Sequence, residues 1–241
     1  MEPKQIYQEL KEFRLTGMAE CWERMVQTGT AASVQLQNGL EMMLQSERDT
    51  RKANRTKRLI KGARFRYGNA FLDDFTFDSS RGRDRTRIIQ LATCDFIRKG
   101  QSVTITGPAG VGKSYMATML GHQACEAGYS VMYLNTQKLL ENVRELRMEG
   151  RVAKYFEKVA DTELVIIEDF GFSVLDGQQL LDFMELIEDR HGRKSTIITS
   201  QLPVKDWYAV LKKNATIADA IIDRIAKTAI HFELSGDSMR K

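Results

Sequence analysis

A glycine-rich segment near the middle of the chain has the spacing of a phosphate-binding loop. Residues 107–114 read GPAGVGKS, which fits the pattern G-x-x-x-x-G-K-[ST] at every fixed position. Glycines let a backbone turn sharply enough to direct several N–H groups at one phosphate. In such a loop the lysine reaches the β- and γ-phosphate oxygens and the following hydroxyl binds Mg²⁺. The segment therefore predicts a site for ATP or ADP with Mg²⁺, with Lys113 and Ser114 in these two roles. The residues predicted to contact the nucleotide here are Gly107, Pro108, Ala109, Gly110, Val111, Gly112, Lys113, Ser114 and Tyr115.

Two adjacent carboxylates follow a second apolar segment. Residues 164–171 read LVIIEDFG, so that Glu168 and Asp169 come directly after four apolar residues. A buried run that ends in charge is costly unless a cation lies nearby. Beside a phosphate loop, one acid would hold the metal and the other would polarise the attacking water. By position Glu168 is the metal-side acid and Asp169 the water-side acid, although the Glu-first order leaves this division open.

A third apolar segment ends in polar residues that could sense the γ-phosphate. It reads STIITSQLP, and its polar end consists of Thr199, Ser200 and Gln201. The other interpretation is an ordinary exit from a strand into a loop. Of these, Ser200 and Gln201 are the candidate catalytic residues.

A single arginine, Arg224, lies among apolar residues in the sequence IADAIIDRI. An arginine there could reach the nucleotide of an adjacent subunit and stabilise the charge of the transition state. It could equally form an ion pair within its own chain with Asp219 or Asp223. The spacing alone leaves both interpretations open.

The elements that would position these residues alternate between strands and helices. Short apolar strands separated by helices predict a parallel sheet that is covered on both faces, which is an α/β fold. The predicted strands are 102–106, 130–134, 163–167, 195–199 and 229–233. The predicted helical segments, some of them broken, are 84–98, 113–127, 137–160, 177–190 and 204–226.

The first 67 residues differ from the rest in pattern and in charge. Helical spacing predicts one helical segment over 4–27, broken near Gly17, and a second helix over 32–61. Residues 1–67 carry a net charge of +5, whereas residues 68–241 carry −1. The sequence therefore predicts a small all-helical domain, 1–67, before a core domain, 68–241. The apolar stripe of the second helix consists of Leu36, Leu40, Met43 and Leu44.

Basic residues dominate the end of that second helix. Residues 48–66 hold nine basic residues and one acid. Because the acids that would normally pair such a face are missing, the pattern favours contact with a polyanion over a merely solvated face. The basic residues that share one helix face are Arg48, Arg51, Arg55, Arg58 and Lys61. A second candidate set for DNA, in the core domain, is Arg144, Arg147, Arg151 and Lys154.

Composition excludes several other classes of protein. Hydrophobic residues at 42% and charged residues at 28% are ordinary for a soluble globular chain. No apolar run approaches the ~20 residues that cross a bilayer, and no signal-peptide core is present at the start. Cys21, Cys94 and Cys125 are far apart, so we expect free thiols, a cytoplasmic protein and no membrane contact.

The chain resembles the IstB family of insertion-sequence ATP-binding proteins, relatives of the DnaC helicase loaders within the AAA+ class. The resemblance covers nearly the whole length and is most specific toward the end of the chain. Besides the phosphate loop and the acidic segment, it is carried by LTGMAE (15–20), FLDDFTFD (71–78), IITSQLPV (197–204), DAIIDRI (219–225) and ELSGDSMR (233–240).

The resemblance implies an AAA+ ATPase core without a substantial C-terminal lid. It also implies an accessory ATPase that binds target DNA, forms homo-oligomers with ATP, and recruits or stimulates a transposase. It implies that Lys113 and Ser114 bind phosphate and magnesium and that Glu168 and Asp169 form the acidic pair. It places Ser200 with Gln201 at the sensor position and Arg224 at the arginine-finger position. It places Phe75 and Phe77 beside the adenine. Arg240 would act on a nucleotide in trans or anchor the tail.

Three other functions share parts of this pattern. A helicase loader has the same core but prefers single-stranded DNA, whose bases stack on aromatic side chains. Residues 48–66 contain only one aromatic residue, Phe65, which favours contact with the backbone of double-stranded DNA. A small-molecule kinase would have no use for the basic helix. A nucleotide-binding adaptor that barely hydrolyses ATP would not need the acidic pair.

Overall fold

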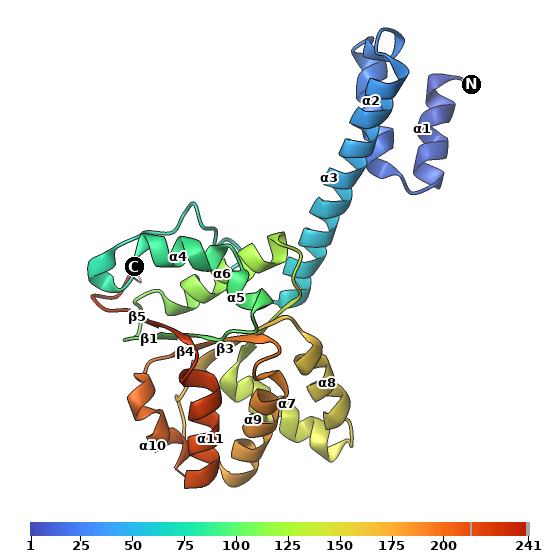
Figure 1. Ribbon diagram of the computed structural model, residues 1–241. Helices are drawn as coiled ribbons and strands as arrows, with labels where there is room; N and C mark the ends of the chain where they lie inside the picture. The colour runs from blue at the N-terminus through green and yellow to red at the C-terminus, as the bar shows by residue number, and fades with distance from the viewer. Residues whose placement is uncertain (213, 240–241) are drawn as a thin grey trace. The chain divides into compact units, whose positions relative to one another are not determined.

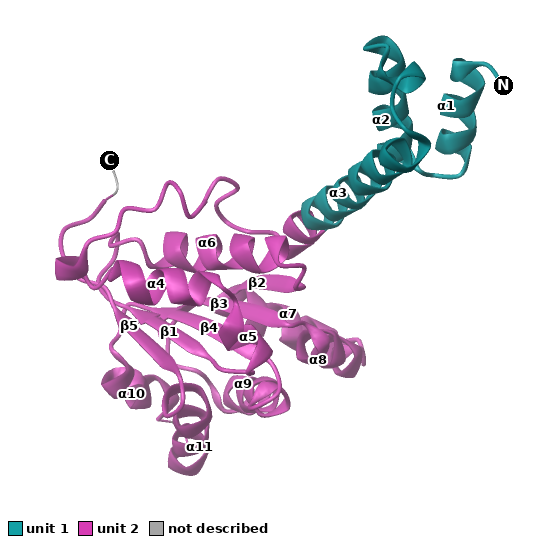
Figure 2. Ribbon diagram, turned by 45° about the horizontal axis from the view of Figure 1, so that its top comes forward, with its two compact units in different colours: residues 1–58 teal, residues 59–241 magenta. Residues whose placement is uncertain are grey.

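The computed structural model describes residues 1–212 and 214–239. Its contacts divide the chain into two compact units, Met1–Arg58 and Leu59–Lys241, which are coloured separately in Figure 2. The division falls within helix α3, Leu36–Ala63, whereas the sequence pattern placed it after residue 67.

The second unit contains a parallel sheet of five strands, as predicted. The strand order is β2-β3-β4-β1-β5, so that β1, which precedes the phosphate loop, lies between β4 and β5. The α/β core with its parallel sheet and the all-helical start of the chain are both confirmed. The strands are β1 (Val103–Thr106), β2 (Val131–Asn135), β3 (Leu164–Phe170), β4 (Ser195–Ser200) and β5 (Ile230–Glu233).

Helices cover both faces of this sheet (Figure 1). Helices α4 (Arg85–Ala92), α5 (Asp95–Arg98) and α6 (Lys113–Glu126) lie on one face. The other face is covered by α7 (Thr136–Met148), α8 (Val152–Asp161), α9 (Gly177–Arg190), α10 (Trp207–Leu211) and α11 (Ala215–Ala226). Each face has its own apolar core, which is why the central strands are apolar on both sides. Short 3₁₀ helices occur at Thr30–Ala32, Ser79–Arg81 and Val204–Asp206.

The helical segment predicted over 137–160 is one of the broken ones and forms two helices. Gly150, with a φ of +70°, lies between α7 and α8. Arg144 and Arg147 are therefore on one helix, whereas Arg151 and Lys154 begin the next. The regular spacing of these four basic residues does not place them on a single helix face.

The first unit consists of α1 (Pro3–Glu12), α2 (Thr16–Gln27) and most of α3. The helix break comes at residues 13–15, where Arg14 has a φ of +59°, and not at Gly17. Gly17 is buried inside α2, and a Cβ there would lie 2.5 Å from the carbonyl oxygen of Ser46. The glycine thus allows α2 to approach α3 closely.

The predicted apolar stripe of α3 is largely exposed. Leu36 is 89% exposed, and Leu40 and Leu44 are exposed as well. The face of α3 that packs against α2 instead contains Ser46, Glu47 and Thr50. The carboxylate of Glu47 accepts hydrogen bonds from the backbone N–H groups of Gly17, at 2.7 Å, and Met18, at 3.1 Å. A buried acid therefore replaces an apolar contact at this point, and it satisfies two N–H groups in the first turn of α2. None of the described helices is both long and apolar enough to span a bilayer.

Candidate nucleotide-binding site

The phosphate loop connects β1 to the start of α6. Its three glycines, Gly107, Gly110 and Gly112, all have positive φ angles, from +83° to +141°. A Cβ on Gly107 would lie 2.1 Å from the carbonyl oxygen of Leu234, and one on Gly110 would lie 2.2 Å from the hydroxyl of Ser238. Glycine is therefore required both by the backbone conformation and by the last described residues, which run along the loop. The first residues of α6, Lys113 and Ser114, line the cavity described below, and a helix N-terminus favours a bound phosphate.

Lys113 is held inside the loop that precedes it. Its ammonium group donates hydrogen bonds to the carbonyl oxygens of Gly107, at 2.7 Å, and Pro108, at 2.6 Å. The side chain is thus positioned before any phosphate arrives, which lowers the entropy cost of binding.

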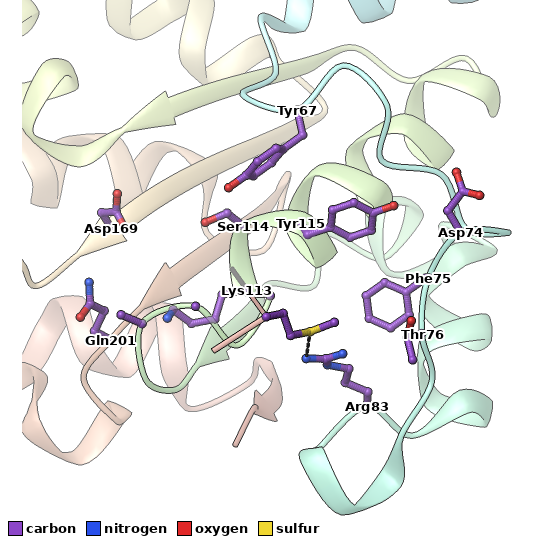
Figure 3. A pocket seen from close by; sticks show the side chains of 14 residues that line it. Tyr67, Asp74, Phe75, Thr76, Arg83, Lys113, Ser114, Tyr115, Asp169 and Gln201 are labelled. Carbon is purple, nitrogen blue, oxygen red and sulfur yellow. Dashed lines mark hydrogen bonds between the residues drawn. The ribbon is translucent and has the colours of Figure 1, made fainter. Parts of the chain in front are cut away.

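A cavity of about 360 Å³ opens beside the loop. Figure 3 shows side chains from the loop, the linker before α4 and the ends of β3 and β4 around it. Its lining residues are Tyr67, Asp74, Phe75, Thr76, Arg83, Ala109, Gly110, Gly112, Lys113, Ser114, Tyr115, Asp169, Gln201 and Met239. Six of them come from the segment predicted to contact the nucleotide.

One end of the cavity is aromatic. The ring of Tyr115 lies 6.2 Å from that of Phe75 and 6.3 Å from that of Tyr67, measured between centroids. Phe77 packs behind Phe75 at 5.4 Å and does not itself line the cavity. Such an end suits the flat apolar faces of a nucleobase.

Arg83 is a residue of this site that the sequence pattern did not identify. It is only 2% exposed, and its Nη2 donates to the carbonyl oxygen of Val111 and lies 2.7 Å from the sulfur of Met239. Its Nε has no hydrogen-bond partner among the described residues. Burial lowers the pKa of Arg83 from its ordinary value. In the sequence it is one of several arginines in a short polar stretch, so no local signal distinguishes it.

The two acids of β3 point to different surroundings because the strand carries a bulge. Ile167 pairs with Ile198 and Phe170 with Ser200, so two residues of β3 oppose only Thr199 of β4. Asp169 has a φ of +58° and lines the cavity. Glu168 does not line it.

Asp169 is held by neighbours on both sides. Its backbone N–H donates to the hydroxyl of Thr199 at 3.3 Å, and the side-chain amide of Asn135 donates to its carboxylate at 3.3 Å. The sequence identified Thr199 only as part of the polar end of its strand, and it did not identify Asn135.

Glu168 is almost fully buried, with 2% of its surface exposed. Its two carboxylate oxygens each lie 3.4 Å from Nη1 of Arg66, a residue that the sequence analysis did not single out. Its backbone carbonyl accepts a hydrogen bond from Thr136. The acid predicted on the metal side is thus paired with an arginine of its own chain.

The oxygen atoms at the cavity fit Mg²⁺ bound together with a nucleotide. Ser114 and Asp169 both line the cavity and supply the hard oxygen ligands that this ion prefers. Among residues 1–212 and 214–239, no cluster of three or more acidic, histidine or cysteine side chains could hold a metal alone. This is the usual arrangement for Mg²⁺, which takes few protein ligands and is held largely by phosphate oxygens and water.

The two candidate sensor residues differ in position. Gln201 lines the cavity. Ser200 is buried, donates to the carbonyl oxygen of Phe170 at 2.7 Å and accepts from the N–H of Leu202 at 3.0 Å. Its hydroxyl is thus engaged in the backbone of the strand ends.

Arg224 lies on α11 and does not line the cavity. It forms an ion pair with Glu188 of α9, and its Nη1 donates to the carbonyl oxygen of Ala220 at 3.1 Å. Its partner within the chain is therefore neither Asp219 nor Asp223, and Asp223 pairs with Lys227 at 2.9 Å. Arg240 lies outside the described residues.

The candidate DNA-binding residues of α3 are exposed along the helix, and Lys61 lies in its last turn. Arg51 forms an ion pair with Glu47 at 2.7 Å. In the second set, Arg147 pairs with Asp182 and Arg151 pairs with Glu149. The other exposed members of the α3 set are Arg48, Arg55 and Arg58.

Residues 8–241 match the family described as IstB-like ATP binding protein. The chain belongs to this family. An insertion sequence ATP-binding protein of Sinorhizobium fredii is 36% identical over 232 residues, which cover 96% of this chain and 94% of the relative. That of insertion sequence IS1162 from Pseudomonas fluorescens is 39% identical over 197 residues, covering 81% of this chain and 84% of the relative.

Solved structures share the fold of this IstB-like chain at low identity. The DnaC helicase loader aligns with a TM-score of 0.57 and 21% identity, over 69% of this chain and 97% of the loader. DnaI aligns with a TM-score of 0.59 and 19% identity, over 71% of this chain and 91% of DnaI. These likenesses support the AAA+ fold.

Proposed function

We propose that this protein is a DNA-binding AAA+ ATPase that assembles with ATP on target DNA and assists the transposase of an insertion sequence. The proposal is carried by the cavity in which the phosphate loop and the carboxylate of Asp169 face the same space. Membership of a family of ATP-binding proteins, and relatives named for insertion sequences, supports the nucleotide and the transposition parts. The exposed basic residues of α3 support the DNA part.

The chain's own residues would bind the nucleotide from both ends. Lys113 would exchange part of its hydrogen bonding to the loop carbonyls for the β- and γ-phosphate oxygens, while backbone N–H groups of the loop surround the phosphates. At the other end of the cavity, the rings of Phe75 and Tyr115 would contact the faces of the base. Bound Mg²⁺ would neutralise charge on the phosphate oxygens, and Ser114 and Asp169 offer it oxygen atoms.

Asp169 would orient the attacking water. Its backbone is fixed by Thr199 and its carboxylate by Asn135, so the orientation is set before the substrate binds. Gln201, which also lines the cavity, would donate to the γ-phosphate. Glu168, the acid predicted on the metal side, does not line the cavity in this structure and is paired with Arg66.

Assembly would bring Arg224 of one subunit to the γ-phosphate bound by the next. To do so it would exchange its ion pair with Glu188 for the phosphate oxygens. ATP would then favour the oligomer over the separate chains because only the γ-phosphate offers this contact.

Contact with DNA would be made chiefly by α3. Arginines on an exposed helix bind phosphates without reading sequence, so binding should be largely sequence-independent and fall steeply with salt. The second set contributes less in this proposal, because α7 and α8 divide it and two of its arginines are already paired with acids.

The alternative function is that of a helicase loader, which would prefer single-stranded DNA. Phe65, the one aromatic residue in the sequence of residues 48–66, stacks on His122 with 4.6 Å between ring centroids. It is therefore engaged within the protein and is not presented to an unpaired base. This observation favours double-stranded DNA.

Fluorescence anisotropy with labelled double-stranded and single-stranded DNA tests the proposal. We expect tight binding to the duplex with ATP and weak binding with ADP or without nucleotide. Lys113→Ala should abolish the ATP effect and ATP-driven assembly, whereas Lys99→Ala, on an exposed surface of the same unit, should change neither. A preference for single strands would favour the helicase loader, and binding to neither DNA would refute the DNA part of the proposal.

A further inference from the structure

Three consecutive residues after α3 contact three different features around the nucleotide site, namely the helix after the phosphate loop, the acidic pair and the cavity wall. We call residues 65–67 the coupling segment. The last turns of α3, which precede it, belong to the same compact unit as the sheet. Ala63 is buried in the core of that unit, and Leu59 and Ile60 pack against it. A displacement of these turns would therefore act directly on the coupling segment.

The first residue of the segment, Phe65, contacts the helix that begins at the phosphate loop. Its ring stacks on His122 of α6 and meets the edge of Tyr133 of β2 at 6.1 Å. A Cβ on Gly121 would lie 2.5 Å from the Cε1 atom of Phe65. The absence of a side chain at this position of α6 thus leaves room for the phenyl ring.

The second residue, Arg66, contacts the acidic pair. Its guanidinium lies 3.4 Å from both carboxylate oxygens of Glu168, and the carboxylate raises the pKa of Arg66 above its ordinary value. Burial raises the pKa of the neighbouring Tyr133, and Glu168 adds to this effect. A carboxylate as buried as Glu168 is strongly destabilised without a cationic partner. Arg66, in contrast, is 47% exposed and can move at much lower cost.

The third residue, Tyr67, lines the nucleotide cavity. Its ring lies 6.3 Å from Tyr115, which follows the phosphate loop, and the guanidinium of Arg66 lies 5.6 Å from the same ring. The segment therefore joins the end of α3 to the phosphate-loop helix, to the acidic pair and to the cavity wall.

We infer that Arg66 is a positioning residue through which the C-terminal turns of α3 and the nucleotide cavity influence one another. This inference rests on the proposed function, because it requires that the chain bind both a nucleotide and DNA. A phosphate contact at Lys61, in the last turn of α3, would shift the coupling segment and change how Arg66 holds Glu168. A nucleotide in the cavity would act on the same contacts from the other side. Coupling of this kind is reciprocal in free energy.

A thermodynamic cycle measures this coupling without relying on turnover. The dissociation constant for a labelled 30-base-pair duplex would be measured with a non-hydrolysable ATP analogue and with ADP. The dissociation constant for a fluorescent ATP analogue would be measured with and without the duplex. The ratio of interest is the duplex dissociation constant with ADP divided by that with the ATP analogue. We expect this ratio to be about tenfold in the unaltered protein, within the usual range for coupled sites. In Arg66→Ala the ratio should fall below about twofold, while affinity for the nucleotide without DNA changes by less than about threefold.

Matched variants separate coupling from general damage. Arg64→Ala removes a neighbouring exposed arginine and should leave the ratio unchanged, and Arg66→Lys should restore part of it. Glu168→Gln should lower the ratio as Arg66→Ala does, and combining the two should add little, because both remove one contact.

Several outcomes would overturn the inference. An unchanged ratio in Arg66→Ala would show that Arg66 does not couple the two sites. Loss of nucleotide binding in the absence of DNA would make it a binding residue instead. If the unaltered protein binds no duplex with either nucleotide, the proposed function fails as well, which distinguishes that result from a failure of Arg66 alone.

Discussion

The backbone N–H of Asp169 donates to the hydroxyl of Thr199 across the bulge between β3 and β4, at 3.3 Å. Asp169 has a left-handed backbone conformation that an aspartate adopts only at some cost. The threonine hydroxyl helps to hold this conformation and so directs the carboxylate into the cavity.

Replacing Thr199 with valine keeps the size of the side chain but removes the acceptor. We expect kcat for ATP hydrolysis to fall by about fivefold, from the loss of ~1 kcal/mol of hydrogen bonding, with little change in nucleotide affinity. Thr199→Ser retains the hydroxyl and should preserve most of the rate. Steady-state hydrolysis and nucleotide titration of both variants would check this, and equal rates in both would contradict it.

Arg83 should matter for nucleotide binding rather than for the chemical step. Its hydrogen bond to the carbonyl oxygen of Val111 helps to hold the backbone of the phosphate loop in place. Arg83→Ala should therefore weaken ATP and ADP binding alike, by about tenfold, as expected from losing ~1.4 kcal/mol. Titration with fluorescent nucleotides would test this. The control is Arg85→Ala, because Arg85 lies over the ring of Phe77 and does not line the cavity.

The basic face of α3 can be tested through its dependence on salt. Replacing Arg51, Arg55 and Arg58 together with alanine should weaken duplex binding and reduce the slope of log K against log salt by about three. Nucleotide binding without DNA should remain intact.

A control removes the same charge elsewhere, through Arg98→Ala, Lys99→Ala and Lys138→Ala in the core. Anisotropy at several salt concentrations gives both slopes. Normal DNA affinity in the α3 variant would show that the helix is only a solvated face.

The first unit should lose stability in acid because of Glu47. Burial alone would raise the pKa of Glu47, but hydrogen bonds from Arg51, Met18 and Gly17 outweigh it and hold the pKa below its ordinary value of 4.5. A lowered folded-state pKa gives stability that is present above pH 4.5 and lost as the pH falls below it.

Glu47→Gln should flatten this acid dependence, and Glu47→Ala should cost about 2 kcal/mol by leaving buried N–H groups unpaired. Amide hydrogen exchange of α2, measured between pH 3 and pH 7, would reveal this loss of stability in acid. Protection factors that do not change with pH in the unaltered protein would contradict the prediction. Glu41→Gln, on an exposed position of α3, provides the comparison.

The sheet could be predicted from the sequence because its strands are short apolar runs whose ends are marked by the phosphate loop and the acidic pair. Predicted and observed strands agree to within a few residues, the largest difference being the extension of β3 to Phe170. The bulge that causes this extension has no sequence signal of its own, since it depends on pairing with Thr199.

Residues whose roles depend on distant partners were not predictable. Arg66 and Arg83 look like other arginines of the chain until the fold brings them to Glu168 and Val111. The stripe that begins at Leu36 has the periodicity of a buried face, yet α2 packs against another side of α3. Periodicity identifies the helix but does not determine which face meets a neighbour when the unit is small.

The bulge in β3 also limits how the acidic pair can vary. Which carboxylate faces the cavity is set by its place in the strand, since the extra residue turns position 169 inward and leaves position 168 beside Arg66. Exchanging the two residue types would thus lengthen the acid in the cavity and shorten the one at the arginine, without exchanging their surroundings. Relatives that carry another order of Asp and Glu should be aligned by position along the strand, and not by matching like residue to like residue.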